Sequence, residues 1–349
     1  MKNTFKNKNI LITGGVGSVG KEIINQIFKF DPGTYVRILD IDESREFELE
    51  HELELKLNPK DFKKLRFFLG DIRDKDRLKR AIEDVDIILH TAALKHVNSC
   101  EYNPFEAVKT NILGLQNLIN VSIENEVEKV IFTSSDKAAN PTNTMGATKL
   151  LGERLMISAN YYKGRRKTIF SSVRFGNVLG SRGSVIPLWI NQIKNGGPVT
   201  LTDPTMTRFV MSMEKAVELL FKSTQIAQGS EVFIFKMPAL RLGDLVEVVI
   251  EETAPKYNLN PRDIKIKTIG LKSGEKYYEE LMTEEEVTRS LETNDMFIVF
   301  PQLKELVNKK YFRELGATDV HSTEYNSHKM PLMSKDKIKK ILYESKALL

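Results

Sequence analysis

The stretch Ile10-Leu11-Ile12-Thr13-Gly14-Gly15-Val16-Gly17-Ser18-Val19-Gly20-Lys21-Glu22 decides the fold. It predicts a short apolar strand, a glycine turn and the start of a helix, in that order. Glycines lack Cβ, so the backbone can turn tightly and approach a pyrophosphate, whose charge the free N–H groups and the positive dipole of the helix start attract. We therefore expect a dinucleotide to be held by this turn, with contacts from Gly14, Gly17, Ser18, Val19 and Gly20.

Short apolar runs recur through the first half of the chain and alternate with segments of helical period. The expected strands are Asn9–Thr13, Tyr35–Leu39, Leu65–Leu69, Val85–His90, Lys129–Ser134 and Thr168–Val173, and the expected helices include Lys21–Phe30, Ser44–Leu57, Asn111–Asn125 and Gly146–Tyr162. Near-continuous apolar strands that alternate with helices indicate a parallel sheet covered on both faces. The predicted fold class is α/β, a doubly wound parallel sheet (Rossmann) with a smaller mixed α/β substrate domain.

The second half of the chain has a looser pattern, rich in Gly and Pro after Val173. We expect residues 1–175 to form the NAD-binding Rossmann domain, with a strand near residues 231–236 that rejoins its sheet. Residues 176–230 and 237–349 are expected to form an interleaved substrate-binding domain, which includes a helix at Met213–Gln225.

The composition is that of a folded soluble protein. The chain has 349 residues, of which 41% are hydrophobic and 28% charged, with a formal net charge of +5. Charges of both signs are spread along the sequence, which indicates a weak preference for anionic ligands and no nucleic-acid partner. Cys100 stands alone, which excludes an intrachain disulfide and a zinc cluster, and we expect no metal site. Residues 1–9 lack the apolar core of a signal peptide and no apolar run approaches about 20 residues, so a cytoplasmic protein without an integral membrane segment is expected.

An acidic residue after the second expected strand points to the type of dinucleotide. Asp40 lies roughly 20 residues beyond the last glycine of the turn, where a carboxylate accepts hydrogen bonds from ribose hydroxyls and repels a 2′-phosphate. The sequence therefore favours NAD over NADP as cofactor. The alternative is that Asp40 merely caps the helix at Ser44 together with Asp42.

Two further strand ends extend the expected cofactor groove. Asp71 and Ile72 follow the third strand, where a short acidic side chain can meet the adenine amino group. Ala92 and Ala93 follow the fourth strand, and their small side chains permit a cofactor to lie close to the backbone. Each position alone is compatible with ordinary packing, but together they form one groove at the carboxyl edge of the sheet.

The chain resembles the extended short-chain dehydrogenase/reductases over nearly its whole length, and within them the nucleotide-sugar 4,6-dehydratases that act on UDP-N-acetylglucosamine in polysaccharide and glycoconjugate synthesis. The segments that carry the resemblance are Ala92-Ala93-Leu94-Lys95-His96-Val97, Asn103-Pro104-Phe105-Glu106-Ala107, Thr133-Ser134-Ser135-Asp136-Lys137-Ala138, Pro141-Thr142-Asn143-Thr144-Met145-Gly146-Ala147-Thr148-Lys149 and Val173-Arg174-Phe175-Gly176-Asn177-Val178.

The resemblance implies an unusual catalytic helix. Most of these dehydrogenases place a Tyr four residues before a Lys that holds the nicotinamide ribose. Here Lys149 is present and Met145 stands in the place of the Tyr. Met cannot take a proton from a sugar hydroxyl, and we expect it to fill the space as an apolar side chain. The resemblance points to a subgroup with the same Met that retains configuration at C5.

The resemblance also assigns roles to the pair Asp136-Lys137. Asp136 is expected to protonate the C6 hydroxyl and Lys137 to take the C5 proton, for which its pKa must fall through repulsion from Lys149 and an oxidised nicotinamide. Ser135 is expected to hydrogen-bond the C4 hydroxyl. The acceptor of the C4 hydroxyl proton stays open between Asp136, Lys137 and a bound water. The alternative for the pair is a surface turn.

The remaining expected contacts follow from the same resemblance. Those with the cofactor include Lys95 and Asn111. Those with the UDP-sugar are Lys95, His96, Asn177, Arg182, Ser184, Val185, Thr200, Arg208 and Glu275. The segment Lys272-Ser273-Gly274-Glu275-Lys276 resembles an element beside the diphosphate and has a solvated loop as its alternative.

The leading hypothesis is a UDP-N-acetylglucosamine 4,6-dehydratase that uses NAD and retains configuration at C5. The first alternative is a nucleotide-sugar epimerase of the same fold, which would leave the pair Asp136-Lys137 without a clear role. The second is a catalytically silent NAD-sensing binding protein, which the absent Tyr would suit. Helices at Asn103–Asn125 and Gly146–Tyr162 resemble those that pair subunits in the family, so a homodimer or higher homo-oligomer is expected.

Overall fold

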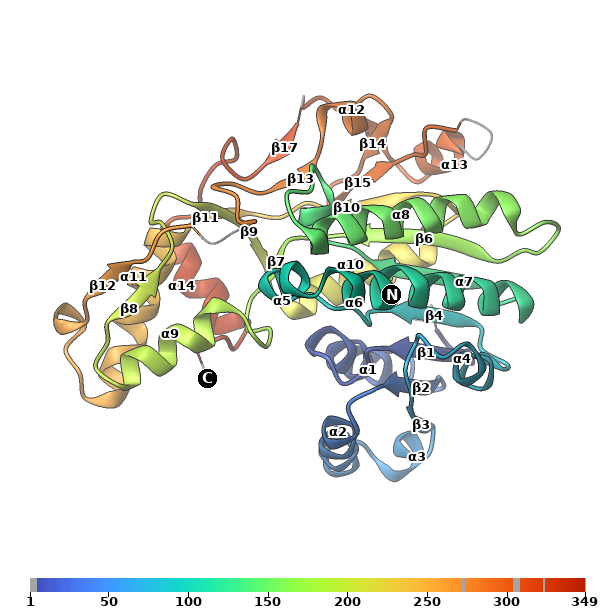
Figure 1. Cartoon of the computed structure of the whole chain (residues 1–349), viewed down its shortest axis with the longest axis horizontal. Helices are drawn as coiled ribbons and strands as arrows, with labels where there is room; N and C mark the ends of the chain where they lie inside the picture. The colour runs from blue at the N-terminus through green and yellow to red at the C-terminus, as the bar shows by residue number, and fades with distance from the viewer. Residues whose placement is uncertain (1–4, 272–273, 304–307, 323, 349) are drawn as a thin grey trace.

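The centre of the molecule is a large, mostly parallel sheet (Figure 1). The computed structural model describes residues 5–271, 274–303, 308–322 and 324–348. Within them, the sheet has ten strands in the order β16-β14-β15-β10-β6-β5-β4-β1-β2-β3. The run from β10 to β3 is parallel throughout, and the strand order reverses beside β1, as in a doubly wound fold. The predicted fold class is confirmed.

The parallel strands begin and end within two residues of those expected from the sequence. Their bounds are β1 Asn9–Thr13, β2 Tyr35–Asp40, β3 Leu65–Leu69, β4 Ile87–His90, β5 Lys129–Thr133, β6 Ile169–Arg174 and β10 Val232–Phe235. The strand expected near residues 231–236 is β10, which pairs with β6 and rejoins the sheet.

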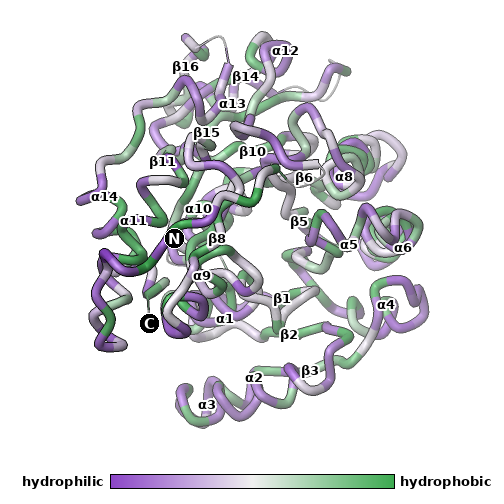
Figure 2. The backbone as a smooth tube through the Cα atoms, turned by 60° about the vertical axis from the view of Figure 1, so that its left-hand side comes forward, coloured by the Kyte–Doolittle hydropathy of each residue, from purple (hydrophilic) through white to green (hydrophobic). Residues whose placement is uncertain are grey.

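Helices cover both faces of the sheet. On one face, α1 (Ser18–Phe30) and α10 (Met213–Ile226) pack over side chains such as Ile12 and Phe233. On the other, α4 (Lys75–Ile82), α7 (Leu115–Glu124) and α8 (Thr144–Tyr162) pack over Leu11 and Val130. Figure 2 shows hydrophilic and hydrophobic segments alternating along outer helices such as α4, because only one side of each helix faces the sheet.

A second lobe stands beside the sheet, at the left of Figure 1. It contains β8 and β12 with α9, α11 and α14, packed around the fully buried Trp189. The bounds of these elements are β8 Val199–Leu201, α9 Val185–Lys194, α11 Leu242–Thr253, β12 Ile266–Thr268 and α14 Lys335–Glu344.

Two small sheets join the lobe to the large sheet. One has the order β11-β9-β7 and the other pairs β13 with β17. Their bounds are β7 Asn177–Val178, β9 Thr207–Met211, β11 Ala239–Arg241, β13 Glu280–Met282 and β17 Tyr325–Asn326. They bring the segment around residue 279 and the start of β9 next to the end of β5.

The C-terminal part of the large sheet differs from the expected division of the chain. Residues 290–319 were assigned to the substrate domain, whereas β14 (Ser290–Glu292), β15 (Met296–Val299) and β16 (Thr318–Asp319) extend the large sheet beyond β10. The physical reason is the fully apolar β15, whose four residues are all buried and which pairs antiparallel with β10. These strands are short and separated by loops, so the sequence pattern does not indicate that the chain returns to the large sheet here.

The helical segment expected at Asn111–Asn125 is longer and less regular than predicted. A nearly continuous helical run follows α5 (Val97–Tyr102), from α6 (Pro104–Val108) through the π-helical turn η1 (Lys109–Gly114) into α7. Such π turns often occur at functional sites. The other described helices are α2 Glu43–Lys56, α3 Pro59–Phe62, η2 Asp136–Ala138, η3 Ala254–Tyr257, η4 Pro261–Asp263, α12 Glu284–Val287 and α13 Lys309–Glu314. Among the described residues, no helix combines the length and apolar character needed to cross a bilayer.

Candidate active site

A long groove of about 830 Å³ follows the carboxyl ends of the parallel strands. Most of the residues expected to bind a dinucleotide line it, namely Gly14, Gly17, Ser18, Val19, Asp40, Asp71, Ile72, Ala92, Ala93, Lys95 and Lys149. Gly20 and Asn111 do not line it. The groove therefore has the position and shape that the sequence predicts for a cofactor site.

The glycine turn approaches the neighbouring strand too closely for any side chain. Gly14 has φ +70°, and a Cβ there would lie 2.7 Å from the backbone nitrogen of Ala92. Gly20 packs directly against the turn, because a Cβ at this position would lie 2.5 Å from the carbonyl oxygen of Gly15. Gly17 is the N-cap of α1 and no side chain caps the helix. The first N–H groups of α1 are thus available to an anion.

Asp40 holds the glycine turn as well as the end of β2. Its carboxylate accepts hydrogen bonds from the backbone N–H groups of Val16, at 3.2 Å, and of Ile41 and Asp42, at 2.8 and 3.2 Å. The N-cap of α2 is Asp42, whose side chain accepts from the N–H of Arg45. The alternative role considered for Asp40, that of a helix cap, therefore belongs to Asp42.

Asn111 supports the groove from beneath. Its side chain accepts from the N–H of Leu94 at 2.8 Å and donates to the carbonyl of Leu94 and to Thr148 Oγ1, both at 3.0 Å. All of these partners lie within the protein, so Asn111 does not line the groove, contrary to the expectation that it contacts the cofactor. It fixes the loop after β4 against α8, and the π turn that carries it supplies the required orientation.

Met145 and Lys149 lie one turn apart on α8 and both line the groove. Met145 is buried in a small apolar cluster with Cys100 and Ala107. Lys149 is buried and donates to the carbonyl of Thr133 at 2.8 Å. Burial lowers the pKa of Lys149 to about 8. The position of the absent Tyr is filled with apolar atoms, and one Lys donor is anchored to the end of β5.

The pair Asp136-Lys137 lies where the groove meets a second cavity of about 280 Å³. Lys137 Nζ lies 3.0 and 3.1 Å from the two carboxylate oxygens of Asp136 and 3.4 Å from Glu279 Oε1. Ser135 Oγ donates to Asp136 Oδ1 at 2.6 Å. The pair is not a surface turn, because the Asp136 side chain is only 2% exposed.

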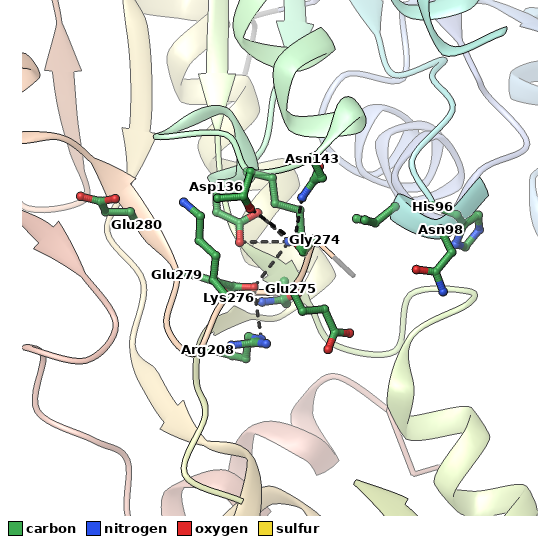
Figure 3. A pocket seen from close by; sticks show the side chains of 14 residues that line it. His96, Asn98, Asp136, Asn143, Arg208, Gly274, Glu275, Lys276, Glu279 and Glu280 are labelled. Carbon is green, nitrogen blue, oxygen red and sulfur yellow. Dashed lines mark hydrogen bonds and ion pairs between the residues drawn. The ribbon is translucent and has the colours of Figure 1, made fainter. Parts of the chain in front are cut away.

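Glu279 was not among the residues expected from the sequence. Its carboxylate accepts from Asn177 Nδ2 at 2.7 Å and pairs with Arg208 Nε at 3.3 Å. Figure 3 shows Asp136, Glu279 and Arg208 in succession along the cavity, with His96 and Asn98 across from them. Burial and the neighbouring Asp136 raise the pKa of Glu279 to about 7. The only sequence signal was its position three residues after Lys276, the last residue of the segment 272–276 noted for other residues.

The charge state of Lys137 is opposite to the expected one. Burial favours the neutral amine, but Asp136 and Glu279 together raise the pKa of Lys137 above its ordinary value. For Asp136, burial opposes ionisation, and the charge of Lys137 nevertheless lowers its pKa. The expectation that the pKa of Lys137 falls is wrong for this structure, because the adjacent Asp136 and, to a lesser extent, Glu279 stabilise the ammonium form.

The residues expected to bind a UDP-sugar divide between the two cavities. His96, Asn177, Arg208 and Glu275 line the smaller cavity, and Lys95, Arg182 and Ser184 line only the groove. Arg182 donates to the carbonyl of Val16, at the glycine turn, at 2.6 Å.

Val185 and Thr200 line neither cavity. Val185 begins α9, and Thr200 is held by hydrogen bonds with Gln192 and Trp189 inside the second lobe. Of the segment 272–276, Lys272 and Ser273 lie outside the described residues. Across the described ranges, no cluster of three or more His, Cys, Asp or Glu side chains is arranged to hold a metal ion.

A buried charge network lies directly behind the site. Arg174 on β6 is fully buried and pairs with Glu153 of α8, at 2.6 Å, and with Glu286 of α12, at 2.9 Å. It also donates to the carbonyl of Leu281 at 2.8 Å, and Ser134 donates to Glu153 at 2.5 Å. The network therefore joins the segment after Glu279 to the helix that carries Lys149.

A family model described as polysaccharide biosynthesis protein matches residues 10–301. The chain belongs to this family. A UDP-N-acetylglucosamine 4,6-dehydratase (inverting) of Campylobacter jejuni is 36% identical over 95% of this chain and 96% of that protein. A UDP-glucose 4-epimerase of Rickettsia bellii is also 36% identical, over 97% of this chain and 96% of that protein. The chain is thus an extended short-chain dehydrogenase/reductase of the nucleotide-sugar dehydratase and epimerase group, as its motifs indicated.

Two further relatives match almost from end to end. A protein of Methanocaldococcus jannaschii named as an uncharacterized membrane protein is 57% identical over 99% of this chain and 98% of its own length. The X-ray structure of Pen from Bacillus thuringiensis is 45% identical, with a TM-score of 0.90 and coverage of 99% of both chains. The relatives' names include both dehydratase and epimerase, so the geometry of the site has to decide between these reactions.

Proposed function

We propose that this protein is a UDP-N-acetylglucosamine 4,6-dehydratase that uses NAD. The observation that carries the proposal is the pair of buried Asp136 and partly exposed Lys137 at the junction of groove and cavity. Loss of water across C5 and C6 needs a base at C5 and an acid at C6, whereas a 4-epimerase needs proton transfer at C4 alone. Asp136 can serve as the acid once it has received a proton, and Lys137 can serve as the base once it has lost one; the two groups lie 3.0 Å apart at this junction.

The groove residues fit a nicotinamide dinucleotide. The N-terminus of α1, which no side chain caps, and the absence of a side chain at Gly14 suit a pyrophosphate. The carboxylate of Asp40 suits ribose hydroxyls and disfavours a 2′-phosphate. Lys149 would hold the nicotinamide ribose. When bound, such a cofactor would supply the hydride acceptor for oxidation at C4 and the hydride donor for reduction at C6.

In this proposal the protons are moved by Ser135 and Asp136. Ser135 donates to Asp136, so a C4 hydroxyl bound at Ser135 can pass its proton through the serine oxygen to the carboxylate. Asp136 then delivers that proton to the C6 hydroxyl, which leaves as water. This path needs no Tyr, which is consistent with the apolar packing of Met145.

The diphosphate and sugar would lie in the smaller cavity. Arg208 presents a planar cation there, and Asn177 and His96 line the same wall. Delivery and removal of the C5 proton on one face would retain configuration, as in the Met-bearing subgroup that the sequence resembles.

The test is an incubation with UDP-N-acetylglucosamine in deuterated water, analysed by mass spectrometry and NMR. The expected product is the 4-keto-6-deoxy sugar with deuterium at C5 and the C5 configuration of the substrate. Recovery of a C4 epimer without loss of water would favour the second candidate, a nucleotide-sugar 4-epimerase, which the name of the Rickettsia relative supports. Binding of UDP-N-acetylglucosamine and NAD with neither product would favour a silent NAD-sensing protein.

We also propose that two copies of the chain associate through the face formed by α5 to α8. Large apolar side chains are exposed along this face, namely Tyr102, Phe105, Leu113, Leu151 and Tyr162. Monomeric proteins rarely expose a contiguous apolar surface of this kind. Sedimentation of the wild type as a dimer and of Phe105→Glu as a monomer would support this interface, and a wild-type monomer would contradict it.

A further inference from the structure

The surroundings of Glu279 are those of a functional carboxylate. The residue is 7% exposed and directly precedes β13. One carboxylate oxygen accepts hydrogen bonds from Asn177 Nδ2 and the N–H of Phe209. The other oxygen lies near the cations Lys137 and Arg208. Glu279 lines the smaller cavity, into which the sugar would bind. Burial and the neighbouring Asp136 favour the protonated form of Glu279, and the donors around it favour the ionised form, so the carboxylate can exist in either state at the cavity wall.

Lys137 needs such a partner. A lysine removes a proton from carbon only through the lone pair of the neutral amine. Between Asp136 and Glu279, the ammonium form is instead stabilised, at 3.0 and 3.4 Å from the two carboxylates. One of these carboxylates must take the Lys137 proton before the amine can act at C5. Asp136 already carries the C4 proton toward C6 in the proposed reaction, so Glu279 is the carboxylate left for this task.

We propose that Glu279 takes a proton from Lys137 and thereby converts Lys137 into the base for C5. The inference rests on the proposed dehydratase function. An N–H bond of Lys137 breaks and an O–H bond forms on Glu279. The amine then takes the C5 proton, the C5–H electron pair forms the C5=C6 bond, and the C6–O bond breaks as Asp136 protonates the departing hydroxyl.

The return steps balance the protons. Lys137 gives its proton back to C5 when the hydride returns to C6, and Glu279 gives its proton back to Lys137. Because Glu279 acts through Lys137 and not on the sugar, it is a positioning residue for the transferred proton.

The charges around Glu279 suggest how substrate binding starts this transfer. Asp136 and Lys137 face it from η2, Arg208 from β9, and Lys276 from the preceding loop. A substrate diphosphate that pairs with Arg208 withdraws that cation from Glu279. The negative Asp136 then dominates the surroundings, which raises the pKa of Glu279 further and favours the protonated carboxyl.

The test compares Glu279→Gln with the wild type in single turnovers. Gln is nearly isosteric and cannot take up the proton. We expect reduced cofactor to form at nearly the wild-type rate, because C4 oxidation does not use Glu279, whereas exchange of the C5 proton with deuterated water and product formation fall roughly 100-fold or more. Glu279→Asp keeps a titratable group and should restore part of the dehydration.

Glu231→Gln serves as the control, because it removes a buried carboxylate that accepts hydrogen bonds from Ser171 Oγ and from the N–H of Gly229, both at 2.8 Å, outside both cavities. It should leave the ratio of dehydration to C4 oxidation unchanged, whatever it does to stability. An equal loss of both steps in Glu279→Gln, or dehydration within threefold of wild type, would overturn the inference. A wild type that makes no 4-keto-6-deoxy sugar would instead overturn the proposed function.

Discussion

Replacement of Arg174 by Met tests how the candidate site is held together. Arg174 is 0% exposed and donates to both oxygens of Glu153 and of Glu286 as well as to the carbonyl of Leu281. Met has a similar length and no charge. The substitution therefore leaves Glu153 and Glu286 buried without their main cation, although Arg289 stays 4.0 Å from Glu286, and we expect a large loss of stability.

The magnitude follows from Glu286. Burial opposes its ionisation, but Arg174 lowers its pKa from 4.5 to about 2. Each pKa unit corresponds to about 1.4 kcal/mol, so this carboxylate contributes about 3 kcal/mol to folding at neutral pH. Removal of one partner from a buried pair generally costs about 3–5 kcal/mol, in agreement with that value.

The sign of the pH dependence provides a second readout. Because the folded pKa of Glu286 is depressed, its contribution is fully present above about pH 4.5 and is lost as the pH falls toward 2. Urea unfolding of the wild type should show this loss, and Arg174→Met should show less of it.

The control is the triple variant Arg174→Met, Glu153→Met and Glu286→Met, in which these three positions carry no charge and stability should return to near the wild-type value. Arg174→Met within 1 kcal/mol of wild type at pH 7, or a triple variant less stable than the single one, would refute the reasoning.

Three other predictions concern the groove. Gly14→Ala should destabilise the protein more than Gly164→Ala and should weaken NAD binding, because both glycines have positive φ but only Gly14 would place Cβ 2.7 Å from backbone; thermal unfolding and calorimetry compare the two. Asp40→Ala should weaken NAD binding roughly 10-fold or more and shift the preference toward NADP, as measured by titration with each cofactor. Burial lowers the pKa of Lys149 from 10.5 to about 8, so the stability of the wild type relative to Lys149→Met should rise by about 3 kcal/mol between pH 8 and 10.5, as followed by urea unfolding.

Local sequence patterns were sufficient to predict the dinucleotide groove. The strand, glycine turn and helix start are consecutive in the chain, and the parallel order places Asp40 and Ala92 at the same edge of the sheet. The direct approach of Gly14 to Ala92 is a consequence of that order. Each of these features depends on residues within one strand–turn–helix unit or on adjacent strands.

The contacts that tune the site could not be predicted in this way. Lys137 and Glu279 are 142 residues apart in the sequence and meet only through two small sheets. A glutamate in a charged loop segment has no pattern that distinguishes it from a solvated residue. The wrong expectation for the pKa of Lys137 has this origin only in part, because the adjacent Asp136 raises that pKa more than Glu279 does.

The same buried network explains how a distant glutamate can hold a position accurate enough for proton transfer. Arg174 binds Glu153, which shares α8 with Met145 and Lys149, and it binds Leu281 and Glu286, which follow Glu279. The distance between Lys137 and Glu279 is therefore fixed by β6 and not by the loop that carries Glu279. A site with such a second carboxylate does not require a tyrosine for proton movement, since Asp136 and Glu279 can each hold one proton while Lys137 moves another. In the proposed mechanism Met145 moves no proton and only packs against Cys100 and Ala107.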